Sequence, residues 1–138
     1  MKTNKGFTLL EVLITLVIIS SFILGVNKIL YTIDKANLIA EEVFQIINYS
    51  QNIMEYLKSE GIELFEGEYQ ESDFIDSNSL ELFRKGISEK MTIFSNIKIE
   101  KLNKFSKVEE ELYLVNLSVY WKGLRGENIY EVNNYISK

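Results

Sequence analysis

The side chains able to do chemistry are few in this chain of 138 residues, which contains no cysteine, no histidine and no proline. Thiolate nucleophiles, imidazole bases and the usual zinc ligands are therefore absent, and carboxylates, hydroxyls and lysines remain. Acids gather in residues 60–79, but without the spacing of a calcium-binding loop. We predict no enzyme, no metal site and no cofactor. A membrane-tethered hydrolase using paired carboxylates has only this acidic stretch in its favour.

Glu11 is the acid in the least expected place. It is the only charged residue between Phe7 and Val26, in an otherwise apolar run. At a rise of about 1.5 Å per residue, this run is long enough to cross the ~30 Å hydrocarbon core of a membrane as a helix. A carboxylate in such a helix costs about 2.5–3.5 kcal/mol on insertion scales, which makes it a candidate functional residue. The alternative is an acid close enough to the membrane surface to remain hydrated.

Lys2 and Lys5 precede the apolar run and indicate its orientation. By the positive-inside rule, the N-terminus stays in the cytoplasm and the residues after Val26 lie across the membrane. No small-x-small cleavage site follows the run, so it differs from an ordinary secretory signal peptide. A plain membrane anchor would explain the lysines and the hydrophobicity, but it would not explain Gly6 or Glu11.

Residues 5–20, KGFTLLEVLITLVIIS, resemble the prepilin signature shared by type IV pilins, the pseudopilins of type II secretion and the competence pilins. The resemblance implies that a membrane prepilin peptidase cuts between Gly6 and Phe7 and then N-methylates the new amine of Phe7. Lys2 and Lys5 would be the basic residues of the leader. A glycine suits such a site because it lets an extended backbone approach the protease without a side chain in the way.

The same resemblance implies a partner for Glu11, which becomes the fifth residue after the cut. In the family, this glutamate is matched to the free N-terminal amine of a neighbouring subunit. Removing either partner would leave a buried unpaired charge, which costs about 3–5 kcal/mol. One such pair per neighbour would fix the axial offset between smooth apolar helices, as a single polar residue fixes register in a coiled coil. The implied partners are other pilin subunits, the inner-membrane assembly platform, and membrane lipid before assembly.

The pattern beyond Val26 predicts one continuous helix from Phe7 to about Ser59, with an amphipathic second half and a stop at Gly61. The apolar stripe of this second half is interpreted as a core face, because a coiled coil would need stricter charges beside it. Its members are Ile33, Ala36, Ala40, Val43, Ile47, Ser50, Met54 and Leu57, widened by Ile39, Phe44, Ile46 and Ile53.

Residues 60–79 predict an irregular, acidic connection that faces the solvent. A short helix is expected after it, because Ser79 is a suitable N-cap and an apolar pattern follows as far as about Lys90.

Three alternating segments predict antiparallel strands, at residues 91–102, 111–121 and 128–137, with a turn at residues 122–127. For Trp121 we predict a core or sheet-edge position with its N–H directed to a polar partner, in preference to a ligand platform. The side chains expected on the core side are Met91, Ile93, Ile97, Ile99, Tyr113, Val115, Leu117, Val119, Trp121, Tyr130, Val132 and Ile136.

These elements predict an α+β fold in which a long N-terminal helix packs on a small antiparallel sheet, the ladle-shaped architecture that the resemblance implies. We expect a leader peptide at residues 1–6, a transmembrane and filament-core helix at residues 7–27, and a globular domain at residues 28–138. The formal net charge of -5 argues against a nucleic-acid partner.

The predicted function is that of a structural subunit of a type IV pilus-like filament. The protein would lie first in the cytoplasmic membrane, with its N-terminus inside, and then in an extracellular filament. The missing proline, and the missing cysteine pair that many major pilins carry, favour a minor pilin. The alternative is a bitopic membrane-anchored protein that binds a ligand or partner without polymerising.

Overall fold

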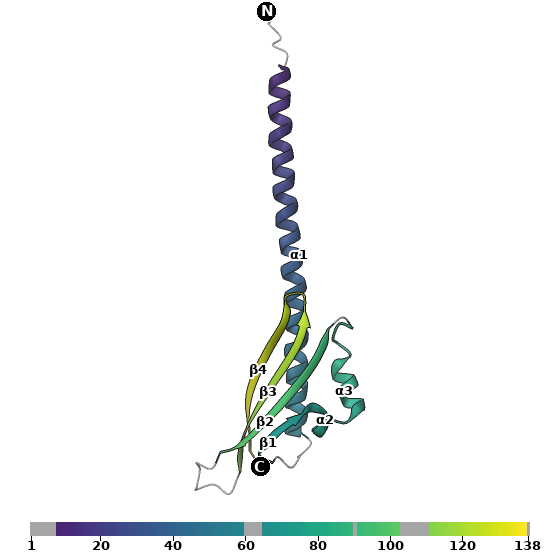
Figure 1. Cartoon of the computed structure of the whole chain (residues 1–138), viewed down its shortest axis with the longest axis vertical. Coiled ribbons are helices and arrows are strands. Elements are labelled where there is room, and N and C mark those ends of the chain that lie inside the picture. The colour runs from purple at the N-terminus through teal and green to yellow at the C-terminus, as the bar shows by residue number, and fades with distance from the viewer. Residues whose placement is uncertain (1–7, 60–64, 90, 103–110, 138) are drawn as a thin grey trace, which may run out of the picture. The chain divides into compact units, whose positions relative to one another are not determined.

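The computed structural model describes residues 8–59, 65–89, 91–102 and 111–137. These residues fall into two compact units that divide between Leu38 and Ile39. The elements, in chain order, are helix α1 (Leu9–Ser59), strand β1 (Gly67–Gln70), helices α2 (Glu71–Phe74) and α3 (Ser77–Arg84), and strands β2 (Thr92–Lys101), β3 (Leu112–Gly123) and β4 (Gly126–Ser137) (Figure 1).

The predicted long helix is confirmed, since α1 runs as one element from Leu9 to Ser59. Thr8 stands immediately before it, and the Thr8 Oγ1 accepts a hydrogen bond from the backbone N–H of Glu11 at 3.3 Å. A threonine at this N-cap position satisfies one of the backbone donors that every helix leaves free in its first turn. Gly61, the predicted stop, lies outside the described residues.

The described strands form one antiparallel sheet in the order β1-β2-β3-β4, so strands adjacent in the chain are adjacent in the sheet. The three predicted strands are present as β2, β3 and β4. Their predicted core sides are confirmed: all five inward residues of β3 are buried, as are Ile97 and Ile99 of β2 and Ile136 of β4. Because successive side chains of a strand point to opposite faces, this alternation was readable from the sequence. The predicted α+β class is therefore confirmed.

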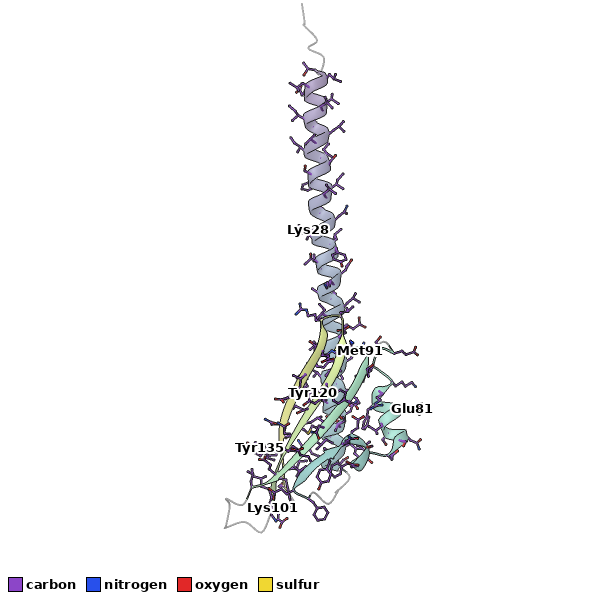
Figure 2. All side chains as sticks on the ribbon, viewed as in Figure 1. Lys28, Glu81, Met91, Lys101, Tyr120 and Tyr135 are labelled. Carbon is purple, nitrogen blue, oxygen red and sulfur yellow. The ribbon has the colours of Figure 1, made fainter. Side chains whose placement is uncertain are left out.

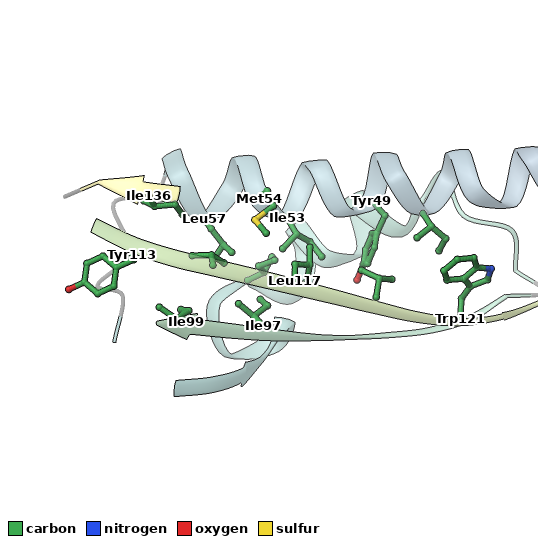
Figure 3. Close-up of a cluster of buried hydrophobic side chains, with 14 residues drawn as sticks. Tyr49, Ile53, Met54, Leu57, Ile97, Ile99, Tyr113, Leu117, Trp121 and Ile136 are labelled. Carbon is green, nitrogen blue, oxygen red and sulfur yellow. The ribbon is translucent and has the colours of Figure 1, made fainter. Parts of the chain in front are cut away.

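The core of the domain lies between the later part of α1 and one face of the sheet (Figure 3). The buried residues of α1 are Ile46, Tyr49, Ser50, Ile53, Met54 and Leu57, a stripe at helical spacing. The predicted stripe is therefore correct from Ile46 onward and wrong before it, since Val43 and Phe44 are exposed. The predicted stripe omitted Tyr49, whose side chain combines a polar hydroxyl with an apolar ring.

The segment predicted to be irregular is instead ordered into β1 and α2 over residues 67–74. The predicted cap of the next helix is also wrong, because Asp76 occupies that position. The Asp76 carboxylate accepts hydrogen bonds from the backbone N–H groups of Asn78 and Ser79, each at 3.0 Å. The Ser79 hydroxyl donates to the same carboxylate, and these bonds lower the pKa of Asp76. An aspartate is at least as good a cap as serine and stands earlier in the chain, so α3 begins sooner than predicted.

The turn between β3 and β4 is confirmed at Leu124 and Arg125, where two residues join strands paired at Gly123 and Gly126. Gly126 has a φ of +94°, a conformation that glycine adopts without the steric strain a side chain would cause. The carboxylate of Glu42 on α1 accepts the backbone N–H of Leu124 with both oxygens, at 3.1 and 3.2 Å. This bond connects the turn to the helix within the domain.

Candidate functional site

Glu11 is the predicted site residue that the structure describes, and it lies exposed in the first turn of α1. The Thr8-x-x-Glu11 spacing is that of a capping box, a signal the sequence analysis missed. A negative charge in the first turn is also favoured by the partial positive charge at a helix N-terminus. Among the described residues, the Glu11 carboxylate has neither a hydrogen-bond donor nor an ion-pair partner, so it is available to a group from elsewhere.

The other predicted site residues are Gly6 and Phe7 at the expected cleavage site, and Lys2 and Lys5 in the leader. All four lie outside the described residues. Cleavage after Gly6 and methylation of Phe7 therefore stay predictions.

The described part of the first unit is a helix whose apolar side chains project to all sides and are exposed among the described residues (Figure 2). The most apolar stretch of α1 has no residue buried by the other described residues. Leu9, Phe22 and Leu24 are 79%, 71% and 70% exposed. This helix is long and apolar enough to cross a membrane, and its uncovered surface fits membrane insertion.

A buried polar cluster surrounds Glu71 in the second unit. The Glu71 carboxylate accepts hydrogen bonds from the hydroxyls of Tyr49 on α1 and Ser95 on β2, and it pairs with the guanidinium of Arg84 on α3. The Glu71 side chain is 8% exposed, whereas that of Arg84 is 47% exposed. A buried carboxylate is tolerated when its lone pairs are filled by donors and a cation, as they are here.

The Glu71 cluster joins four elements, α1, α2, α3 and β2. Burial, followed by the hydrogen bond to Glu71, raises the pKa of Tyr49 to about 12. The tyrosine therefore remains protonated and continues to donate its hydrogen bond over the ordinary pH range. Every group in the cluster has a partner within the protein, which favours a role in holding the domain together. The predicted solvent exposure of residues 60–79 is therefore wrong for Glu71, because nothing local distinguishes it from its acidic neighbours.

Trp121 lies in the core at 7% exposure, as predicted (Figure 3). Its Nε1 is buried, and no hydrogen-bond acceptor for it is found in the part of the chain that the structure describes. The predicted polar partner is thus not among these residues. The same part of the chain holds no group of three or more acidic side chains arranged to bind a metal ion.

A long apolar helix, followed by an α+β domain whose antiparallel sheet packs on the end of that helix, defines a pilin-like architecture. Residues 1–27 match the family model of the prokaryotic N-terminal methylation motif, which is the signature of type IV prepilins. No curated protein and no solved structure matches the chain.

The matched residues contain Gly6, Phe7 and Glu11 and most of the membrane-compatible helix. The motif therefore supports the resemblance drawn from the sequence, and it implies processing by a prepilin peptidase and assembly with other pilins. The match ends before the domain begins, so the nature of the domain rests on its structure alone.

Proposed function

We propose that this protein is a structural subunit, a minor pilin, of a type IV pilus-like filament. The observation that carries the proposal is that the methylation motif coincides with a helix whose apolar side chains are uncovered among the residues that the structure describes. An isolated anchor accounts for the helix alone, whereas a prepilin accounts for both the motif and the helix. The protein itself catalyses no reaction in this proposal; the prepilin peptidase acts on it.

The exposed helix explains why such a subunit would leave the membrane only into a filament. Fully burying one large apolar side chain is worth roughly 1.5–3 kcal/mol, and the first unit exposes many of them. Lipid covers these side chains before assembly. Neighbouring helices of the same kind cover them afterwards, so the inner-membrane assembly platform can move the subunit without exposing its helix to water.

In the proposed filament, Glu11 fixes the axial position of one subunit's helix relative to its neighbours. The surfaces of these helices are otherwise mostly apolar. The Glu11 carboxylate has no partner among the described residues, and it lies in the first turn, close to where processing would create a new amine. In the proposed filament, it pairs with the N-terminal amine of Phe7 of a neighbouring subunit. A buried carboxylate without its amine would cost about 3–5 kcal/mol, so helices shifted from this position are disfavoured.

The test is the mass and the N-terminal sequence of the protein extracted from membranes, with and without a prepilin peptidase in the cell. We expect a start at Phe7, carrying one added methyl group, only when the peptidase is present. Gly6→Leu should remain unprocessed, because the side chain obstructs the cleavage site.

The matched control for that variant is Gly25→Leu, since Gly25 lies within α1 and has open space around it. This control should be processed normally. An intact Met1 in both wild-type samples would overturn the proposal and favour the bitopic anchored protein instead.

A further inference from the structure

The two edges of the sheet differ in how they are protected. Strand β1, at one edge, has 4 residues, and a short edge strand offers little backbone for pairing. Strand β4, at the other edge, has 12 residues and no further strand beside it among the described residues. Natural edge strands are commonly protected by lysine, proline or bulges, yet β4 contains no lysine, arginine or proline. The β4 edge is therefore the candidate surface.

The backbone register determines which groups of β4 face this edge. The N–H of Leu102 donates to the carbonyl of Leu112 at 2.8 Å, next to the Lys101 and Tyr113 pair. Hydrogen-bonded and non-hydrogen-bonded pairs alternate in an antiparallel ladder, so even-numbered residues of β3 bond to β2 and odd-numbered ones bond to β4.

The partners of the odd-numbered β3 residues on β4 are even-numbered. The remaining backbone groups of β4, those of Glu127, Ile129, Glu131 and Asn133, consequently point away from the sheet. The open stretch ends at Tyr135, whose N–H donates to the side-chain Oδ1 of Asn134 at 3.0 Å.

A groove runs beside this open edge, between β4 and the part of α1 within the same domain. Its volume is about 350 Å³, and its lining includes Gln51, Met54, Glu55 and Lys58 from α1, and Tyr130 and Val132 from β4. A strand added to β4 would direct alternate side chains into this groove, because successive side chains point to opposite faces. Met54, Tyr130 and Val132 supply the apolar part of this lining, so the side chains that enter beside them should be aliphatic.

The other side chains of an added strand would lie on the opposite face, beside Glu127, Ile129 and Glu131. Ile129 is 49% exposed there, and both glutamates are exposed. Glu127 lies opposite Lys122 of β3, whereas Glu131 lies opposite Ser118, so it is chiefly Glu131 that favours lysine or arginine on the incoming strand. A second copy of β4 that paired antiparallel about Ile129 would instead place its Glu131 and Glu127 opposite Glu127 and Glu131, and like charges across strands are destabilising.

We propose that the open edge of β4 binds an extended segment of a different polypeptide, which adds to the sheet as a further strand. Its inward side chains are aliphatic and enter the groove beside α1. Its outward side chains are basic and lie next to Glu127 and Glu131. This strand addition uses the mode in which backbone hydrogen bonds give affinity and alternate side chains give specificity. It does not require the protein to polymerise, so it is independent of the proposed filament role.

The test uses the full-length protein in detergent micelles and two synthetic peptides of roughly eight residues. One peptide alternates lysine with valine, and the other alternates glutamate with valine. We expect the lysine peptide to bind about tenfold or more tightly than the glutamate peptide, as measured by fluorescence anisotropy. Binding should slow hydrogen exchange at the amides of Ile129, Glu131 and Asn133, whose N–H groups become bonded.

Three variants decide the interpretation. Glu131→Lys should reverse the peptide preference. Ile129→Pro should abolish binding without unfolding the domain, since its N–H faces the open edge and makes no ladder bond. Glu81→Lys, on the exposed face of α3, changes the net charge equally and should leave binding unaltered.

Equal binding of both peptides, or protection elsewhere in the domain, would overturn the proposal. Peptide binding that is unchanged in both Glu131→Lys and Ile129→Pro would also overturn the proposal. Dimers of the free protein that protect the same three amides would assign the edge to a second copy of the chain instead.

Discussion

The hydroxyl of Tyr49 on α1 donates a hydrogen bond to the carboxylate of Glu71 on α2, and both side chains lie inside the domain. The two residues come from elements that show no shared pattern in the sequence. Their contact therefore fixes the position of α2 against α1.

Arg84→Met should destabilise the domain more than Tyr49→Phe does. Without the guanidinium, the buried Glu71 carboxylate loses its cation, and we expect a loss of about 2 kcal/mol after allowing for the partial exposure of Arg84. Tyr49→Phe removes one hydrogen bond to a charged group and should cost about 1.5 kcal/mol. Urea unfolding in mild detergent, followed through Trp121, the single tryptophan, measures both values. Lys85→Met, one residue further along, is the control, and an equal loss in that variant would contradict the prediction.

The domain should lose stability in alkaline solution through Tyr49, which lies outside the membrane-compatible segment. The folded state raises the pKa of this hydroxyl to about 12 from an ordinary value of 10.0. The unfolded state therefore releases its proton first, and the free energy of unfolding falls as the pH rises between these two values. Unfolding measured at several pH values should show a steeper fall for the wild type than for Tyr49→Phe. Parallel curves for the two proteins would contradict this assignment.

Gly123→Ala and Glu42→Ala should not be additive. A Cβ at Gly123 would meet the Glu42 carboxylate, which must then move and release the N–H of Leu124. We expect each single change to cost about 1 kcal/mol and the double variant to cost little more than one of them. The measurements are urea unfolding and the exchange rate of the Leu124 amide. Gly86→Ala is the matched control, since nothing lies within 4 Å of a Cβ built there. Additive losses would mean that the two residues act separately.

Leu117→Ala should cost about 2–5 kcal/mol, because Leu117 is fully buried between the sheet and α1. Leu114→Ala makes the same chemical change three residues away on the opposite face of β3, where the side chain is partly exposed. We expect that loss to remain below about 1 kcal/mol. The comparison, made by urea unfolding, tests which face of the sheet carries the core. Similar losses at both positions would contradict the observed packing.

Glu11→Gln should leave processing intact and reduce incorporation into filaments by about tenfold or more, if the proposed assembly is correct. The amide keeps the size of the side chain but cannot pair with a charged amine. Quantitative immunoblotting of membrane and filament fractions gives both the processed fraction and the incorporated fraction. Glu55→Gln, in the exposed part of the second unit, is the control. Normal incorporation of the Glu11→Gln variant would show that the Glu11 carboxylate is not needed for assembly.

Local patterns were enough to predict the long helix, the three long strands and their inward faces. In these segments the period of the side chains is repeated over many residues, and a buried face therefore leaves a regular trace in the sequence. Residues 67–74 have no such trace. Strand β1 exists because it pairs with β2, with Tyr69 opposite Ile97, and that contact is made with residues far along the chain.

The sequence by itself determined the N-terminal segment, because its hydrophobicity, the spacing of Gly6, Phe7 and Glu11, and the methylation motif are all properties of adjacent residues. It also determined the alternation of the strands. Only the tertiary structure decided that Glu71 is a buried partner of Tyr49, and that β4 is left with an open edge beside a groove. Both depend on which distant segments come together. That choice is made by the sum of many weak contacts across the whole domain, and no short stretch of the chain records it.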